Sequence, residues 1–319
     1  AQCQLRRMAE SLGTLRAIVN DSTSFSTPSE PGNRAPLGIV TVTYSPGEYL
    51  GRFIDSISTA VSQKARVVLA DNGSTDGVPE RTAEQYEWVE FLDTGGNLGY
   101  GGGMNAGANA LRPMREAGEI DTEYLLLVNP DVEFNAGSID KLIACARRWD
   151  KAGSVGPKIV EPDGTIYPSA RAIPSIINGI GHSIFADIWP SNPWSRAYRD
   201  DDDMDTERVS GWLSGSCLLV RWDAFDAIGG FDERYFMYLE DIDLADRMSR
   251  AGYLNIFCPD ATINHAQGHS TAVHSKKMLR AHHDSAYRFI SDRHPKPWQA
   301  PLRWVIKTGL QVRSRLLSS

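Results

Sequence analysis

Three continuously apolar segments constrain the fold of this chain more than any other feature. They are LGIVTVTY at 37–44, ARVVLA at 65–70 and YLLLV at 124–128. Between the first two lies a segment, 49–61, whose apolar residues recur at helical spacing. Strands that are apolar throughout must be covered on both faces, which is typical of a mostly parallel sheet between helices. The sequence therefore predicts the α/β class, with strands and helices alternating from residue 37.

Polar residues follow these strands, at the sheet edge where ligands bind in such folds. Asp71 opens DNGSTDG (71–77), which is either a turn or a place where a carboxylate meets a base or ribose. The glycine-rich stretch 95–107 is either a flexible loop or a place where backbone N–H groups approach a diphosphate. NPD at 129–131 is either a proline turn or, through Asp131, a site for Mg²⁺ or Mn²⁺.

Acidic residues gather at a helix start in the second half of the chain. The pattern at 240–250 predicts a helix whose first turn holds Glu240, Asp241 and Asp243, where carboxylates also suit the helix dipole. Asp243 and Arg247 stand four residues apart and are predicted to form an ion pair. Glu240 and Asp241 follow aromatic residues, so they either cap the helix or keep a general base poised.

Shorter strands are expected at 155–160, 216–221 and 254–257. His265 follows the last of them and is either a polar loop residue or a metal ligand with Asp131 as its partner. The acidic run at 200–203 looks like a metal motif, but it follows no strand and is interpreted as a solvated loop.

Composition excludes several classes of protein. The formal net charge is −7, so a basic surface of the kind that binds nucleic acid is absent. No stretch of about 18 apolar residues and no apolar signal region occur, so neither a membrane-spanning helix nor a secretory leader is expected. The four cysteines lie far apart without a CxxC pair, which suggests neither a zinc site nor a disulfide framework and favours a reducing cytosolic setting: Cys3, Cys145, Cys217 and Cys258.

Five motifs, taken in order, resemble the inverting GT-A glycosyltransferases of family 2. They are TVTY, ADNGSTDG, GNLGYGGGMNAG, LLLVNPDVEF and SGWLSGSCLLVRWDAFDAIGGFDERYFMYLEDIDLADR, with His265 after them. The resemblance implies a Rossmann-like, mixed and mostly parallel sheet flanked by helices, with a helical C-terminal extension. It covers a catalytic domain (37–270) with a nucleotide-binding half (37–131) and an acceptor half (132–270). Residues 21–36, rich in Ser, Thr, Pro and Gly, predict a flexible linker within the N-terminal segment 1–36, and a basic helical region (271–319) follows the domain.

The resemblance also assigns roles by position on the donor side. The pyrimidine and ribose of a nucleotide sugar would be held by Thr43, Tyr44 and Asp71, with Asn105 close to them. The first acid of the family's DxD motif is Asn129 here. Metal ligation would therefore rest on Asp131, with His265 as the second ligand. Histidine ligation leans towards Mn²⁺, and Mg²⁺ stays open.

On the acceptor side, the resemblance makes Asp241 the general base, while Glu240 would bind acceptor hydroxyls. Trp212 and Gly215 would shape the acceptor site, and Arg171 is a candidate for contacting the acceptor's diphosphate. A carboxylate that removes a hydroxyl proton during one direct displacement inverts the anomeric centre. No covalent nucleophile is then needed, and the sequence offers no persuasive Ser–His or Cys–His arrangement.

Within the family, the NLGYGGGMN and NPD motifs resemble those of bacterial rhamnosyltransferases. This implies transfer of L-rhamnose from dTDP-L-rhamnose to polyprenyl-diphosphate-linked N-acetylglucosamine in cell-wall polysaccharide linker synthesis, at the cytoplasmic face of the membrane. Two alternatives keep the fold: another nucleotide sugar, or a non-catalytic nucleotide-sugar-binding protein. A nucleotide-binding oxidoreductase would need its glycine loop after the first strand, which is not the arrangement here. The sequence leaves homo-oligomer formation open.

The C-terminal end differs in charge from the rest of the chain. Residues 276–319 hold ten Lys or Arg and two acids, a net charge of +8, so the remainder carries −15. In 301–319, apolar residues alternate with cations, which fits either a helix packed on the body or one lying on an anionic membrane surface. The lipid-linked acceptor implied above favours peripheral membrane contact, helped by the apolar stretch 173–189.

Overall fold

The computed structural model describes residues 35–173, 203–266 and 275–318. The predicted N-terminal segment and nearly all of the predicted linker lie outside these residues. So do nearly all of the apolar stretch 173–189 and most of the acidic run at 200–203.

Strands and helices alternate through the first part of the fold, as predicted. The elements are β1 (Leu37–Thr43), α2 (Tyr49–Ala60), β2 (Ala65–Asp71), α3 (Val78–Gln85), β3 (Val89–Asp93), α4 (Gly99–Glu116), β4 (Tyr124–Val128), β5 (Val132–Phe134), α5 (Ser138–Arg148) and β6 (Ala152–Val160). After them come two short strands, β7 (Ile166–Tyr167) and β8 (Ala170–Arg171). The second half contains β9 (Arg208–Ser210), β10 (Trp212–Leu213), β11 (Cys217–Arg221), α8 (Trp222–Ala227), α9 (Glu240–Arg250) and β12 (Leu254–His265). Two long helices, α10 (Ser275–Arg293) and α11 (Ala300–Ser318), flank the short 3-10 helix η2 (Pro297–Gln299).

The strands form a mixed sheet in the order β3-β2-β1-β4-β11-β6-β12-β5, with β7 beside β6 and β9 beside β12. Strands β1, β2, β3 and β4 are parallel, whereas β11 is antiparallel to both of its neighbours, β4 and β6. The carboxyl ends of β1, β2 and β4 therefore share one edge of the sheet with the start of β11. The separate two-stranded sheet of β8 and β10 is antiparallel.

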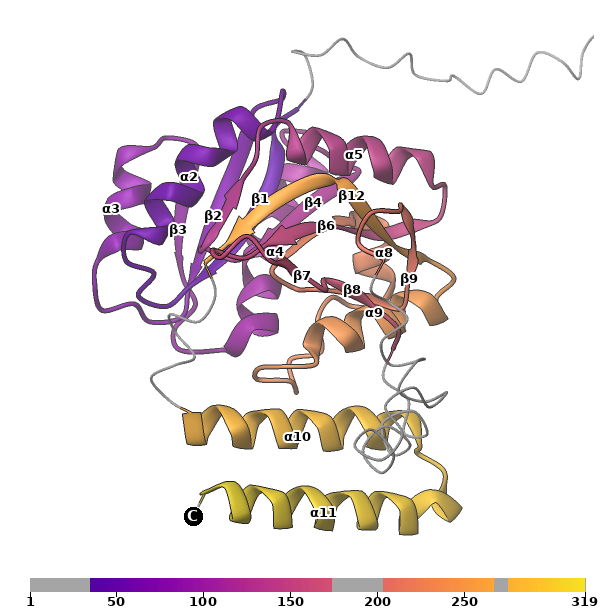
Figure 1. Ribbon diagram of the computed structural model, residues 1–319. Coiled ribbons are helices and arrows are strands. Elements are labelled where there is room, and N and C mark those ends of the chain that lie inside the picture. The colour runs from indigo at the N-terminus through magenta and orange to yellow at the C-terminus, as the bar shows by residue number, and fades with distance from the viewer. Residues whose placement is uncertain (1–34, 174–202, 267–274, 319) are drawn as a thin grey trace, which may run out of the picture. The chain divides into compact units, whose positions relative to one another are not determined.

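Helices cover both faces of the sheet (Figure 1). Side chains alternate across a strand, and in β1 Leu37 and Ile39 face one core while Val40 faces the other. The first core contains buried residues of α2 and α5, and the second contains residues of α4, α8 and α9. This double coverage explains why the strands are apolar throughout.

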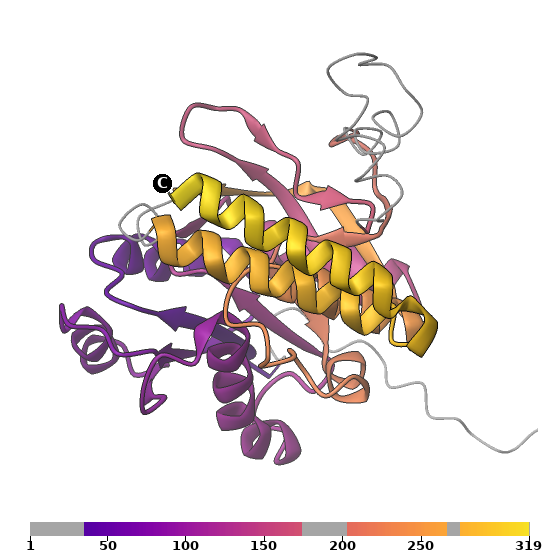
Figure 2. The ribbon, with the colours of Figure 1, turned by 90° about the horizontal axis from the view of Figure 1, so that it is seen from below.

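Helices α10 and α11 lie side by side (Figure 2). Phe289 of α10 is buried in a cluster with Tyr235, which lies before α9, and Ile242, which lies on α9. Arg293 at the end of α10 forms an ion pair with Asp246 of α9 at 2.7 Å. Helix α10 is thus packed against the start of α9. No helix among the described residues is both long and apolar enough to cross a membrane.

Strand β12 is longer than the sequence predicted. Its expected span was 254–257, but it continues to His265. Its pairing with β6 shifts register between Cys258 and Thr262. That irregularity interrupts the alternating pattern, so only the first part of the strand is visible from periodicity. His265 consequently ends a sheet strand instead of lying in a loop.

Candidate active site

The acidic pair Glu240 and Asp241 opens α9, and an unusual backbone turn precedes it. Tyr238 and Leu239 both have positive φ, at 69° and 63°. Bulky side chains rarely adopt this left-handed region, and such strain is concentrated at functional sites. The turn places two neighbouring carboxylates at the first residues of a helix, as the sequence predicted.

Asp241 is tied to the segment before β11. Its Oδ2 accepts a hydrogen bond from the backbone N–H of Gly215 at 3.0 Å, and its Oδ1 accepts one from the N–H of Ile242 at 2.8 Å. The hydroxyl of Tyr100 donates to the carbonyl of Gly215. A Cβ at position 215 would lie 3.3 Å from the Cβ of Asp241, a tight contact. Glycine at 215 thus lets the chain approach the carboxylate closely.

The surroundings of the pair favour protonation. Glu240 is 8% exposed, and its Oε2 has no hydrogen-bond partner among the described residues. Burial, followed by the charge of Asp241, raises the pKa of Glu240 to about 8. Burial also raises the pKa of Asp241, against the opposing effect of its backbone hydrogen bonds. A carboxylate pair with raised pKa values in a structured corner can take up a proton near neutral pH.

A second group of side chains contains the predicted metal ligands. The Oδ1 of Asp131 lies 3.1 Å from the Nε2 of His265, and the Nδ2 of Asn129 lies 3.4 Å from the same nitrogen. Pairing of β5 with β12 sets His265 opposite Val132, directly after Asp131. The backbone N–H of Ala266 also donates to the carbonyl of Asp131 at 3.2 Å. The predicted partners Asp131 and His265 are therefore brought together.

The acidic pair and the predicted metal ligands are joined by a short stretch of chain. The backbone N–H of Asn129 donates to the carbonyl of Ser216 at 2.9 Å. Ser216 follows Gly215, whose N–H holds Asp241. The hydroxyl oxygens of Ser214 and Ser216 are themselves 2.6 Å apart. The acidic pair and the Asp131–His265 pair thus lie on either side of one turn before β11.

Thr43 and Asp71 lie opposite each other at the ends of β1 and β2. The hydroxyl of Thr43 donates to Asp71 at 2.7 Å, and Asp71 also accepts the backbone N–H groups of Gly73 and Ser74 at 3.0 and 2.8 Å. Both side chains are buried, whereas Tyr44 is 51% exposed. Asp71 therefore shapes the turn, and the Tyr44 side chain that follows β1 is open to solvent.

The glycine-rich stretch 95–107 is mostly helix, which corrects its interpretation as a loop. Helix α4 begins at Gly99 and includes the remaining glycines. A Cβ at Gly103 would lie 2.7 Å from the side chain of Val42, and one at Gly107 would lie 2.3 Å from that of Val40. These glycines let α4 pack closely on β1. Only the start of the stretch, up to residue 98, precedes the helix.

Asn105 is buried within α4. Its Nδ2 donates to the carbonyl of Phe231 at 2.9 Å and to Glu233 at 3.0 Å, and its Oδ1 accepts the N–H of Phe231 at 2.9 Å. The amide thus holds the segment that leads to α9. A direct nucleotide contact for Asn105 stays a prediction.

Trp212 and Arg171 pair across the small sheet of β8 and β10. Trp212 is nearly buried, and its Nε1 donates to the carbonyl of Ala172 at 3.1 Å. The Nε of Arg171 donates to the carbonyl of Pro168 at 2.9 Å, and its guanidinium lies over the ring of Tyr167, 5.7 Å from the centroid. Strand β10 ends just before the turn at Gly215, and Trp212 packs in a cluster with Ile242 of α9.

Sequence reasoning noted the aromatic residues just before the pair, which include Tyr238, but missed Tyr100 and Tyr167. Burial raises the pKa of Tyr100 most, and the charges of Glu240 and Asp241 raise it further. The pKa values of Tyr167 and Tyr238 are also raised, first by burial and then in part by these carboxylates. Tyr100 stands inside the NLGYGGGMN motif, so that motif was a signal for it. Tyr167 carried no such signal.

This sequence and this fold are similar to those of known proteins. The sequence model of glycosyl transferase family 2 matches residues 38–228. N-acetylglucosaminyl-diphospho-decaprenol L-rhamnosyltransferase of Mycobacterium tuberculosis (strain H37Rv) is 49% identical over 284 residues, covering 88% of this chain and 92% of that protein. Rhamnosyltransferase WbbL of Escherichia coli (strain K12) is 25% identical, covering 79% and 92%.

The fold also matches a solved structure, that of a mannosyltransferase from Pyrobaculum calidifontis in complex with GDP-Man and Mn²⁺. The TM-score is 0.52 at 17% sequence identity, over 88% of this chain and 71% of that chain. The mixed, mostly parallel sheet with C-terminal helices agrees with the GT-A architecture expected from the motifs. The family match spans more than half of the chain and includes β1, β4, β11 and the turn at Gly215. The chain therefore belongs to glycosyl transferase family 2 and is a glycosyltransferase.

Proposed function

We propose that this enzyme is an inverting, metal-dependent rhamnosyltransferase that moves L-rhamnose from dTDP-L-rhamnose to polyprenyl-diphosphate-linked N-acetylglucosamine. One observation carries the proposal: the Gly215 N–H donates to Asp241 and the Asn129 N–H donates to the Ser216 carbonyl, so the acidic pair is joined to the Asp131–His265 pair. Direct displacement of a nucleotide diphosphate needs a base on the acceptor side and charge stabilisation on the leaving-group side.

The relatives support the choice of sugar and acceptor. The Mycobacterium tuberculosis protein is named for L-rhamnosyl transfer to N-acetylglucosaminyl-diphospho-decaprenol, and the Escherichia coli protein is also a rhamnosyltransferase. Identity of 49% over most of both chains favours a shared acceptor class, and with it a role in cell-wall polysaccharide linker synthesis. The dTDP nucleotide rests on the resemblance of the motifs to those of rhamnosyltransferases.

The donor nucleotide is assigned to the carboxyl ends of β1 and β2. Tyr44 offers an exposed ring for the pyrimidine, while Thr43 and Asp71 fix the turn that meets the ribose. Asn105 holds the 231–233 segment behind this site. Trp212 and Gly215 shape the acceptor side, and Arg171 is assigned to the acceptor's diphosphate.

The transfer itself is assigned to the acidic pair. Asp241 accepts the proton of the acceptor hydroxyl while that oxygen attacks the anomeric carbon and the bond to the diphosphate oxygen breaks. Backbone N–H groups of Gly215 and Ile242 keep the carboxylate oriented. Glu240 offers an unpaired buried oxygen that can accept a second acceptor hydroxyl. A single displacement inverts the anomeric centre.

Asp131 and His265 fit a divalent cation. They present one carboxylate oxygen and one imidazole nitrogen 3.1 Å apart, with side chains 20% and 12% exposed. Mixed oxygen and nitrogen ligands suit Mn²⁺, and Mg²⁺ prefers oxygen ligands. A cation bound there would neutralise charge growing on the leaving diphosphate. Asn129 supplies an uncharged amide beside them.

We also propose that the enzyme works at the inner face of the cell membrane through its C-terminal helices. Trp298, Trp304 and Val305 are 71%, 69% and 60% exposed. Arg303 and Lys307 lie among them, so apolar and cationic groups occur together. Such a surface favours an anionic lipid leaflet, where each cation contributes about 1 kcal/mol. A polyprenyl-linked acceptor is reached from that surface.

The deciding experiment measures release of dTDP from dTDP-L-rhamnose with and without polyprenyl-diphosphate N-acetylglucosamine. Acceptor-dependent release, with a rhamnosylated lipid as product, is expected. A panel of other nucleotide sugars tests the donor, and faster turnover of another sugar would replace rhamnose in the proposal. Donor and Mn²⁺ binding without turnover would favour a non-catalytic binding protein.

A further inference from the structure

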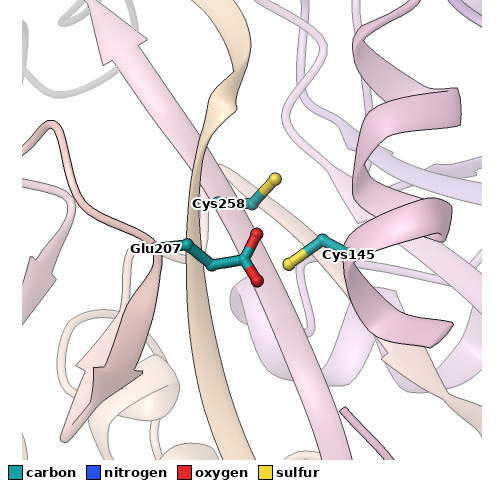
Figure 3. A group of neighbouring side chains, drawn as sticks. All are labelled: Cys145, Glu207 and Cys258. Atoms are coloured by element: carbon teal, nitrogen blue, oxygen red, sulfur yellow. The ribbon is translucent and has the colours of Figure 1, made fainter. Parts of the chain in front are cut away.

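Two buried cysteines and a glutamate converge at a place that none of the roles assigned above uses. Cys145 lies on α5, Glu207 directly precedes β9, and Cys258 lies on β12. One ligand atom from each residue lies within 4.8 Å of the other two. Figure 3 shows the Cys145 sulfur and the Glu207 carboxylate facing each other, with the Cys258 side chain beside them. The three residues are 62 and 51 positions apart in sequence, so no sequence motif announces them.

The carboxylate in this cluster is held in place by neighbours. The Nε1 of Trp149 donates to Glu207 at 2.8 Å, and the guanidinium of Arg148 forms an ion pair with the same carboxylate. The Glu207 side chain is 25% exposed, whereas both cysteines are buried. Hydrogen bonds that orient a ligating group from behind are a regular feature of metal sites.

The two thiols make only weak contacts with the rest of the protein. Cys145 and Cys258 are free, with no disulfide between them. The thiol of Cys258 donates to the backbone carbonyl of Lys141 at 3.8 Å, a long contact that contributes little. Cys145 also lies within hydrogen-bonding reach of Cys258 and Glu207, but thiols are weak donors and acceptors, so a cation would satisfy the three groups better.

We propose that Cys145, Cys258 and Glu207 bind one structural Zn²⁺. Binding replaces the two thiol protons, which pass to solvent, with two sulfur–zinc bonds. Two thiolates, one carboxylate, the Arg148 cation and Zn²⁺ then sum to zero charge. Tetrahedral coordination with bonds of about 2.0–2.3 Å sets ligand atoms roughly 3.5–3.8 Å apart, so small side-chain rotations complete the site. The exposed side of Glu207 leaves room for water as the fourth ligand.

This zinc would connect three elements around β12. Cys258 stands where the pairing of β12 with β6 shifts register, and His265 ends the same strand. Tying α5 and the β9 segment to that irregular point would stiffen the strand that presents His265. Because the site binds through sulfur, it is chemically distinct from the Asp131–His265 pair.

The test uses the full-length purified protein and needs no activity measurement. After removal of metal with a chelator, Co²⁺ is added as a probe, because thiolate ligands give a charge-transfer absorption that oxygen and imidazole ligands do not. One equivalent with this band, displaced by Zn²⁺, is expected, together with a higher melting temperature in Zn²⁺. Cys145→Ser and Cys258→Ser should lose the band, whereas Cys217→Ser, another buried cysteine, should keep it.

A subtler variant tests the supporting contacts. Trp149→Phe keeps an aromatic side chain but removes the N–H that donates to Glu207. Zinc affinity should then fall about tenfold or more. Absence of the charge-transfer band in a folded wild-type protein with free thiols would overturn the proposal. Loss of two mass units on mild peroxide treatment, together with absence of metal binding, would also overturn it and identify a disulfide-forming pair instead.

Discussion

Asp241 accepts the backbone N–H of Gly215 at 3.0 Å, so the first turn of α9 and the entrance to β11 are held together. This contact aligns a carboxylate with a turn that also reaches Asn129 through Ser216. The proposed catalytic geometry therefore rests on backbone hydrogen bonds as well as on side chains.

Replacing Asp241 with Asn should abolish turnover while leaving donor binding intact. The amide keeps the size of the side chain but cannot take a proton, and general-base catalysis typically contributes about 10²–10⁴-fold. Acceptor-dependent dTDP release and donor calorimetry measure the two effects. Glu84→Gln, at an exposed position of α3, is the matched control. Full activity in Asp241→Asn would remove Asp241 from the role of base.

Tyr100→Phe should lower kcat about tenfold with a smaller change in KM. The Tyr100 hydroxyl supports the Gly215 carbonyl, and its loss loosens the turn that orients Asp241. Tyr86→Phe is the control, since that hydroxyl donates to Asp55 at the surface at 3.1 Å. Equal effects on kcat and KM in Tyr100→Phe would instead indicate a general packing role.

From the raised pKa values of the acidic pair, we expect a particular dependence of stability on pH. Because the pKa of Glu240 is raised to about 8 in the folded state, this carboxyl keeps its proton to a higher pH there than in the unfolded chain. Its contribution to stability is therefore present at low pH and is lost as pH rises through about 8.

Glu240→Gln should remove this pH dependence. At pH 8.5 the variant should melt at least about 3 °C above the wild type, the shift expected for roughly 1 kcal/mol in a domain of this size. The acid limb of kcat/KM should keep its position in this variant, because Glu240 still carries its proton where Asp241 ionises and places no charge beside it. Identical melting profiles from pH 5 to 9 would contradict the raised pKa.

Asn129→Asp should strengthen metal binding. The substitution restores the first acid of the DxD motif beside His265, where the amide nitrogen now lies at 3.4 Å. The Mn²⁺ concentration for half-maximal activity should fall roughly tenfold, which corresponds to about 1.4 kcal/mol. Asn109→Asp, on the exposed side of α4, serves as the control. An unchanged Mn²⁺ requirement would show that the cation does not contact this position.

Deletion of residues 301–319 should abolish binding to vesicles that contain anionic lipid. Trp304→Ser with Val305→Ser should weaken binding in the same assay, because both exposed groups would otherwise enter the interface. Ile166→Ser removes an exposed apolar group elsewhere and should have no effect. Unchanged co-sedimentation of the deletion variant would place the basic helix on the protein body instead.

By itself, the sequence determined the alternating strands and helices and the edge of the sheet where polar groups gather. It did so because strands buried on both faces must be apolar along their length, as in β1, β2 and β4. It also placed Glu240 and Asp241 at the start of a helix and anticipated the Asp243–Arg247 ion pair, which measures 2.7 Å. These are local patterns, readable over a few turns of chain.

Only the tertiary structure decided what depends on distant segments. It set His265 beside Asp131 by continuing β12 through a register shift, and it brought Gly215 and Tyr100 to Asp241. It showed that most glycines of 95–107 belong to helix α4, where they allow close packing of α4 on β1. It also gathered Cys145, Glu207 and Cys258, because packing brings together residues whose sequence separation carries no signal.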